Sequence, residues 1–257
     1  MGHFKTTLKY KFLLNELVMR DIKIKYRRSF LGVLWTLLNP LLMMIVLTLI
    51  FSNIFRFSID NFPVYLLCGQ LIFNFFSEAS NMALTSILSN GSLIKKVYVP
   101  KYLFPLSKVF SSLVNLFASF VALLLVMIFT QSQITWTILF APLPLLYICL
   151  FTLGVSLLLS ALSVFFRDIM HLYGVLLTAW MYFTPVFYPL DILPEGIRSI
   201  VEFNPLTSFI NLFREVVMYN QVPTLSLNLV CLAYSLVMLG IGAYVFYKNQ
   251  DKFILHI

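Results

Sequence analysis

The sequence predicts an all-α membrane protein with six transmembrane helices in a single domain, residues 1–257. The first observation is composition: 60% of the 257 residues are hydrophobic and only 11% are charged, less than half of the roughly 25% usual in soluble domains. The second is that the few charges leave apolar stretches of membrane-spanning length between them. Together these observations exclude an ordinary soluble enzyme, a disordered chain and a disulfide scaffold.

The amino-terminal stretch, residues 1–28, contains eight Lys or Arg and two acids, so it is too charged to cross a membrane. Apolar side chains are interleaved with the basic ones, a pattern that fits an amphipathic helix lying at the membrane interface. A purely electrostatic anchor that only sets topology fits the pattern equally well. The stretch lacks the apolar core of a cleavable signal peptide.

Six charge-poor stretches follow, each able to hold one helix of about 20 residues. The 58 residues from 109 to 166 carry no charge, which is too long for one helix and suits two. The polar run Gln131-Ser132-Gln133 marks the break between them. The predicted spans are residues 31–55, 63–88, 107–130, 139–165, 169–189 and 225–247.

The basic residues predict the orientation of these spans. Six spans put both termini on one side, and 15 of the 18 Lys and Arg residues fall on that side. Because Lys and Arg are enriched in cytoplasmic loops, we expect both termini in the cytoplasm.

Residues 89–106 form the predicted cytoplasmic loop between the second and third spans. Gly91 and Pro100 delimit a short segment in this loop. The segment mixes basic and apolar side chains: Leu93, Ile94, Lys95, Lys96, Val97, Tyr98 and Lys101. A loop that only fixes orientation does not need exposed apolar side chains, so the mixture favours a protein partner. A purely topogenic loop is the alternative.

Residues 190–224 predict short helices on the outer face before the last span. Asn204-Pro205 is typical of a helix start, with Asn as the N-cap and Pro at the first position. Apolar residues follow at helical spacing from Leu206 to Val217. These helices are too short to span, so we expect re-entrant or amphipathic outer helices.

Several kinds of chemistry are not supported by the sequence. It contains no G-x-x-x-x-G-K-[ST] phosphate loop, no HExxH and no DxD pair. The three dispersed cysteines indicate buried apolar side chains rather than a metal or redox site. Glu78 is the one acid within a predicted span; it is either a functional group or hydrogen-bonded inside the bundle or a dimer interface. No metal or cofactor is expected in this chain.

Five sequence blocks resemble ABC-2 type permeases, and more narrowly the membrane subunits of bacterial exporters of O-antigen, capsule-like polysaccharide and teichoic acid. The blocks follow the family's order along the chain: residues 20–40, 90–101, 166–169, 184–189 and 204–207. The resemblance implies an amino-terminal interface helix, a coupling helix at residues 93–101 and re-entrant outer helices. It also implies a homodimer in the bacterial cytoplasmic membrane that binds two ATPase subunits, which carry the ATP and Mg.

The function implied by the resemblance is ATP-driven export of a lipid-linked polysaccharide or teichoic acid, with no nucleic-acid partner. The interface helix would present basic residues and a tyrosine to membrane lipids or to the substrate's phosphate: Arg20, Lys23, Lys25, Tyr26, Arg27 and Arg28. Aromatic rings that pack on sugar faces are candidates for the channel: Phe73, Phe76, Tyr182, Phe183, Phe187 and Tyr188. Helix packing and aromatic belts are the alternative for each ring. An exporter of lipids or drugs and a secondary transporter without an ATPase are the alternative functions.

Overall fold

The computed structural model describes residues 10–26, 31–54, 59 and 61–257, and the regular structure in these residues is helical throughout. The helices that correspond to the predicted spans are α3 (Trp35–Ile54), α4 (Phe62–Leu84), α7 (Leu103–Phe129), α8 (Pro142–Phe165), α9 (Ile169–Tyr182) and α12 (Leu225–Asn249). Short 3-10 turns connect or extend them: η1 (Gly32–Leu34), η2 (Trp136–Phe140), η3 (Leu190–Ile192) and η4 (Gln250–Lys252).

Within the described residues, three helical stretches are long and apolar enough to cross a membrane: Leu103–Phe129, Trp136–Phe165 and Leu225–His256. The apolar stretches of α3 and α9, Trp35–Phe51 and Ile169–Tyr182, are shorter. These findings confirm an all-helical protein with apolar helices of membrane length.

The fifth predicted span, residues 169–189, is shorter in the structure because α9 ends at Tyr182. Pro185 lacks a backbone donor and disfavours a helical conformation of the residue before it. At a rise of about 1.5 Å per residue, the helix reaches only about 21 Å. The absence of charge up to residue 190 therefore predicted the apolar character of this stretch but not the end of its helix.

The long helices pack around α4, which contacts α3, α7, α8 and α11 (Pro205–Val217). α8 and α12 approach each other most closely, because Gly154 and Gly242 leave room for the opposite backbone. Aromatic rings fill the space between α4, α8 and α9: Phe76 lies against both Phe151 and Trp180. This core fixes the positions of the polar side chains on the other faces of α4.

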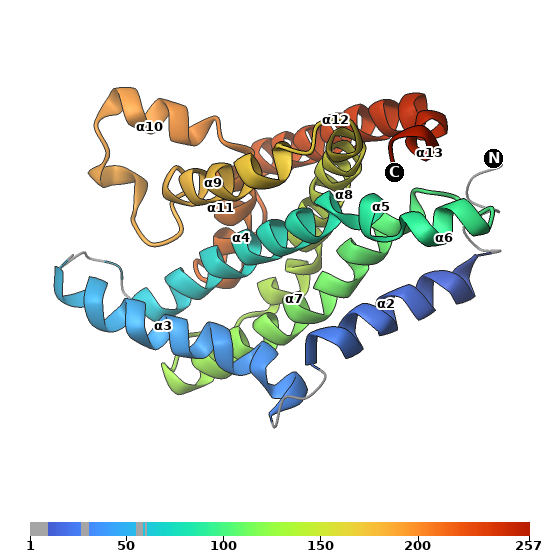
Figure 1. Ribbon diagram of the computed structural model, residues 1–257. Helices are drawn as coiled ribbons and strands as arrows, with labels where there is room; N and C mark the ends of the chain where they lie inside the picture. The colour runs from blue at the N-terminus through green and yellow to red at the C-terminus, as the bar shows by residue number, and fades with distance from the viewer. Residues whose placement is uncertain (1–9, 27–30, 55–58, 60) are drawn as a thin grey trace.

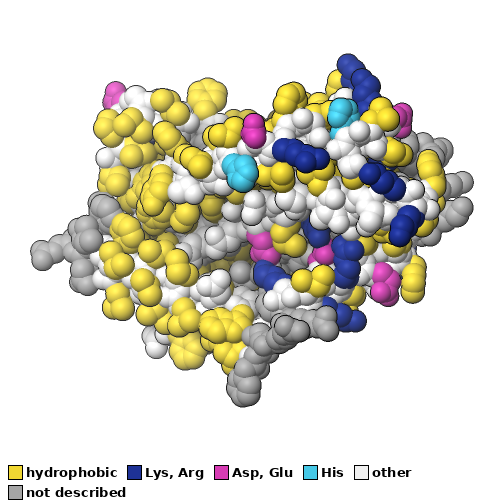
Figure 2. Space-filling model, in the orientation of Figure 1, with side chains coloured by type: hydrophobic (Ala, Val, Ile, Leu, Met, Phe, Trp, Pro, Cys, Tyr) yellow, Lys and Arg dark blue, Asp and Glu magenta, His cyan; other side chains and the backbone are white. Residues whose placement is uncertain are grey.

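The two ends of the bundle differ in their short elements and in their charge. Figure 1 shows α5 (Ser86–Ser89), α6 (Gly91–Lys96) and α13 (Phe253–His256) toward one end and α10 (Glu195–Glu202) at the other. α2 (Lys11–Tyr26) lies along α7. In Figure 2 the Lys and Arg side chains gather on the half of the face that carries α6 and α13, while the half that carries α10 is mostly hydrophobic.

The predicted outer segment contains two helices, α10 and α11. The predicted helix start is confirmed: Asn204 is the N-cap, its side chain accepts a hydrogen bond from the Leu206 N–H at 3.1 Å, and Pro205 opens α11. Most side chains of α11 are buried, whereas Ile197, Ile200 and Phe203 in and beside α10 are exposed.

Candidate functional site

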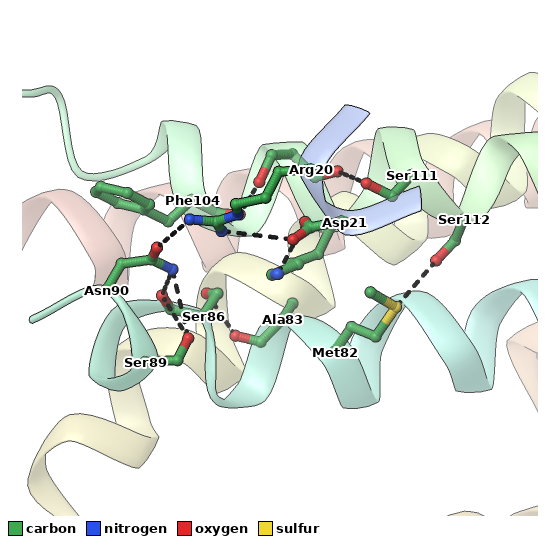
Figure 3. A network of polar contacts seen from close by, with 12 residues as sticks. Arg20, Asp21, Met82, Ala83, Ser86, Ser89, Asn90, Phe104, Ser111 and Ser112 are labelled. Atoms are coloured by element: carbon green, nitrogen blue, oxygen red, sulfur yellow. Dashed lines mark hydrogen bonds and ion pairs between the residues drawn. The ribbon is translucent and has the colours of Figure 1, made fainter. Parts of the chain in front are cut away.

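α2 is joined to the rest of the bundle by polar contacts near its middle. Arg20 donates to Asn90 Oδ1 at 3.1 Å, and Asn90 is the residue from which α6 starts. The next residue, Asp21, pairs with Lys108 Nζ of α7 at 2.8 Å, and both side chains are largely buried. Figure 3 shows Arg20 between Asn90 and Asp21, with α2 passing beside α7. These contacts connect the predicted interface helix to the predicted coupling loop.

Glu78 of α4 links α2 and α7 farther along the bundle. Its Oε1 atom accepts hydrogen bonds from Lys25 Nζ and from Asn115 Nδ2, both at 2.6 Å. Of the two alternatives for this acid, the structure therefore matches the second, in which Glu78 is hydrogen-bonded inside the bundle. The side chains of Lys25 and Glu78 are 42% and 27% exposed, so a solute can reach the pair.

A polar groove of about 720 Å³ lies beside this ion pair, between α3, α4 and α7. α4 contributes residues that recur every three or four positions and so share one face of the helix: Gln70, Asn74, Ser77, Glu78 and Asn81. The other polar lining residues are Lys25 from α2, Thr36 and Asn39 from α3, and Asn115 and Ser119 from α7. Polar side chains at this density are unusual in an apolar bundle, where each is costly unless it has a partner or a function.

Lys25 and Glu78 also line a second cavity, of about 610 Å³, together with Arg20, Asn90 and Lys108. Because both cavities share the same two residues, the ion pair lies at the boundary between them. The second cavity is flanked by the predicted coupling loop, and the first by α3 and α7. Separation of Lys25 from Glu78 would remove the contact at this boundary.

Sequence reasoning singled out Glu78 but missed the rest of the groove. The signal was present: Gln70, Asn74, Ser77 and Asn81 recur at helical spacing along the second predicted span. The predicted spans were bounded by charged residues. Because Gln and Asn carry no charge, they do not stand out within a charge-free stretch. A search for polar periodicity within each span would have found this face.

Four of the seven predicted coupling residues form an exposed tip around α6. Tyr98 is 91% exposed and Val97 52%, and the side chains of Lys95 and Lys96 are also exposed. Ile94 is buried and Leu93 half-buried against the bundle. The helix is shorter than the resemblance implied for residues 93–101, because α6 ends at Lys96 and Val97 is extended.

Two lysines of this loop hold the carboxyl-terminal segment. Lys95 Nζ donates to the main-chain carbonyl of Ile257 at 2.6 Å, and Lys101 Nζ donates to that of Gln250 at 2.5 Å. Gly91 packs so closely on Ile257 that an added Cβ would collide with its side chain. The loop and residues 250–257 thus form one surface.

The other predicted interface residues are placed only in part. Lys23 is exposed on α2, and Tyr26 is the last residue of that helix. Arg27 and Arg28 lie outside the described residues. Of the six, Arg20 and Lys25 already contact protein groups, as described above.

Two of the six candidate channel aromatics are packed inside this chain. Phe73 and Phe76 of α4 are buried, and the ring of Phe76 contacts those of Phe151 and Trp180. Neither ring lines the polar groove. Helix packing, the alternative considered for each ring, describes their position in this chain.

The other four candidate aromatics lie at the end of α9 and in the loop that follows. Tyr182 and Phe183 are 64% and 53% exposed. Phe187 contacts the rings of Tyr182 and Tyr188, with ring centroids 6.0 and 5.5 Å apart. This cluster is open to a solute, whereas the rings on α4 are not.

The loop that carries these aromatics is held by Arg214 of α11. Its guanidinium donates to the main-chain carbonyls of Pro185, Val186 and Tyr65 at 2.9 to 3.1 Å and lies 3.4 Å over the Tyr65 ring. Arg214 is only 2% exposed. Burial lowers the pKa of the guanidinium below its ordinary value, while the three carbonyls provide acceptors for the buried charge.

The described residues offer little for metal or redox chemistry. Among them no three His, Cys, Asp or Glu side chains lie close enough to hold a metal ion. Cys68 and Cys231 are buried thiols and Cys149 is half-buried, and none of the three forms a disulfide. The polar groove and the exposed α6 tip are two features of the described residues that can receive a ligand or a partner.

Comparison with known proteins adds family relationships to this geometry. Residues 13–218 match the family described as ABC-2 type transporter. The chain is 34% identical over 246 residues to the O-antigen export system permease protein RfbA of Myxococcus xanthus, a match that covers 95% of both chains. It is 30% identical to a protein of the same name from Klebsiella pneumoniae, covering 97% of this chain and 96% of the relative. It is also 25% identical to the polysialic acid transport protein KpsM of Escherichia coli, covering 95% and 96%. The family match includes most of α2, the α6 loop and the residues that line the groove.

Proposed function

Because this chain belongs to the ABC-2 type transporter family, we propose that it is the transmembrane permease subunit of an ATP-driven polysaccharide exporter. Its relatives are named as permeases or transport proteins for O-antigen, polysialic acid and capsule polysaccharide. The structural observation that carries the proposal is the exposed tip around α6. This tip suits the docking of a separate ATPase subunit.

The chemistry of the tip supports this docking. Tyr98 and Val97 expose apolar surface beside two lysines, and tyrosine is among the residues that dominate protein–protein binding energy. α6 continues from α5 and α4, and Asn90 contacts Arg20 of α2. A force applied at the tip therefore reaches both the interface helix and the central helix. In this proposal ATP and Mg bind to two partner subunits, and the permease carries no cofactor.

The arrangement in the membrane is part of the proposal. α3, α4 and α9 complete six spans with the three long apolar helices, and both termini lie in the cytoplasm of a bacterial cell. The gathering of Lys and Arg around α6 and α13 supports this orientation. Two copies form a homodimer, and the exposed apolar face of α3, which includes Leu42, Val46 and Leu49, is available to a second copy or to lipid.

The proposed substrate is a lipid-linked glycan that enters from the cytoplasmic side. Basic residues of α2, among them Lys23, attract its phosphate, each contributing about 1 kcal/mol near the surface. The exposed rings of Tyr182 and Phe183 contact the sugars near the outer end. Teichoic acid, which is also a phosphate-containing polymer, stays an alternative substrate, and so do a lipid or a drug.

The test is ATPase stimulation and glycan export by the assembled complex. Tyr98→Ala with Lys96→Glu should lower the stimulation of the partner ATPase by the permease to near its basal level. The matched control is Phe129→Ala, which truncates an 85% exposed ring at the far end of α7. Full stimulation and assembly by the α6 variant would contradict docking at this tip. Ion-driven flux by the chain alone would contradict the exporter and support a secondary transporter.

A further inference from the structure

The polar groove between α3, α4 and α7 is lined by side chains that both donate and accept hydrogen bonds. Its carboxamides are Asn39, Gln70, Asn74, Asn81 and Asn115, and its hydroxyls are Thr36, Ser77 and Ser119. A carboxamide has two N–H donors and an acceptor oxygen, and a hydroxyl has one donor and two acceptor sites. The charged lining residues, Lys25 and Glu78, pair with each other. The groove therefore offers many hydrogen bonds and no net charge.

Gln70 provides an independent indication of a ligand. Its side chain is only 4% exposed, and its Oε1 atom has no hydrogen-bond partner among the described residues. A buried carbonyl oxygen without a donor costs about 1 to 3 kcal/mol. One turn away on the same face of α4, Asn74 is exposed to the groove. If the Gln70 amide turns its oxygen toward the groove, a ligand hydroxyl there would supply the donor that this oxygen lacks.

The shape of the groove and one aromatic ring restrict the kind of ligand. Its volume of about 720 Å³ is within the range of about 300 to 1,000 Å³ found for small-molecule sites. Trp35, which is 44% exposed, adds an apolar ring face to the lining. A lipid tail would leave the amides without partners. A sugar fits better, because its hydroxyls match the amides and its C–H face matches the indole ring.

We propose that this groove binds a short segment of the glycan within one copy of the chain, with Gln70, Asn74 and Asn81 hydrogen-bonding sugar hydroxyls. The proposal rests on the proposed export function. Neutral, exchangeable hydrogen bonds suit a moving polymer, because no single contact holds it tightly. The ligand lies beside the Lys25–Glu78 pair, which is shared with the cavity next to the coupling loop.

The direct test is photo-crosslinking in cells that make the polymer, with the full chain and its ATPase partner present. A photo-reactive benzoylphenylalanine replaces Asn74, Asn81 or, as a control, Gln133 in the exposed loop between α7 and α8. Adducts that a glycan-specific lectin or antibody detects should form at positions 74 and 81 and not at 133. Adducts to lipid or to a second copy of the chain alone would overturn the proposal.

The second test measures the initial rate of glycan export at limiting substrate. Gln70→Met conserves the volume of the side chain and removes its amide, and should lower this rate by about tenfold, the effect of one unmet hydrogen bond. Gln133→Met makes the same chemical change outside the groove and should leave the rate unchanged. Both variant chains should assemble with the ATPase partner to the same extent as the parent chain, measured by co-purification.

The two proposals fail differently in these experiments. Wild-type export by Gln70→Met and by Asn74→Leu, without sugar adducts at positions 74 and 81, would overturn the groove site and leave the export function standing. Undiminished surface glycan after deletion of the gene would instead overturn the proposed function. Slower export together with sugar adducts in the groove supports the site.

Discussion

Gly154 of α8 and Gly242 of α12 face each other where the two helices come closest. A Cβ added to Gly242 would collide with the carbonyl of Gly154, and a Cβ on Gly154 would collide with the main chain at Met238. Gly240, two residues away on α12, has open space around it. In a membrane, burial of apolar surface provides little drive for association, so close backbone packing holds helices together.

Gly242→Ala should therefore destabilise the bundle, whereas Gly240→Ala should not. Overpacking at such a contact costs about 1 to 3 kcal/mol. At position 240 alanine gains up to about 1 kcal/mol of helix propensity without a collision. Thermal unfolding of the purified chain in detergent compares the two variants. Equal melting temperatures would show that the close crossing is not required.

The two glycines of α12, Gly240 and Gly242, also show how much of the helix packing can be predicted from the sequence. Gly240-Ile241-Gly242 lies within an apolar span, where small residues are typical of close helix packing, but the pattern does not distinguish the two glycines. Only the rotation of α12 against α8, which depends on every contact between them, decides that Gly242 is the one at the crossing. Local sequence indicates that a helix packs closely; tertiary structure decides with which residue.

The spans and the groove illustrate the same limit. The absence of charge placed α7, α8 and α12 well, because a charged side chain is costly in an apolar bundle. It placed the end of α9 poorly, because Pro185 ends a helix without interrupting the apolar run. The same criterion did not identify Gln70 and Asn74 as groove residues, because their amides carry no charge. The contact of Arg20 with Asn90 joins residues far apart in sequence, so no local pattern predicts it.

The Asp21–Lys108 pair should hold α2 against α7. Both side chains are largely buried, and removal of one partner from a buried ion pair costs about 3 to 5 kcal/mol. Asp21→Asn should therefore increase hydrogen exchange of the backbone amides of α2, measured by mass spectrometry, more than that of α4. The control is Glu16→Gln, the same chemical change at an exposed position of α2. Equal exchange in the two variants would contradict this role of the pair.

Arg214 should hold the loop of residues 183–189 through its planar guanidinium. Arg214→Lys keeps the charge, but an ammonium group cannot reach the three carbonyls in the same flat geometry. Loss of one or two charge-assisted hydrogen bonds costs about 2 to 4 kcal/mol. The variant should melt at a lower temperature and exchange amide hydrogens faster in the loop.

The control for Arg214 is Arg198→Lys on α10. Arg198 pairs with Glu202 at 2.8 Å, and its side chain is 45% exposed, so the same substitution should leave the free energy of unfolding nearly unchanged. If the two variants are equally stable, the carbonyl contacts of Arg214 contribute little. If only Arg214→Lys is destabilised, geometry rather than charge holds the loop.

The Lys25–Glu78 pair should control access to the groove. Lys25→Glu replaces an attraction by a repulsion at the boundary of the two cavities, so α2 should move away from α4. Access can be measured with Asn74→Cys in the groove, labelled by a water-soluble maleimide. Loss of the ion pair should cost about 1 kcal/mol of interaction free energy, the upper range for a part-exposed pair. Maleimide labelling at position 74 should then be about fivefold faster.

Charge reversal at both positions separates this gating from a general loss of structure. Lys25→Glu combined with Glu78→Lys restores an ion pair of opposite polarity, and Asn115 can turn its amide so that its oxygen accepts from the new lysine. The double variant should therefore return the labelling rate toward that of the parent, as a coupled pair requires. Cys68 and Cys231, both buried, should label slowly in every variant. Fast labelling in the double variant would show that the pair does not close the groove.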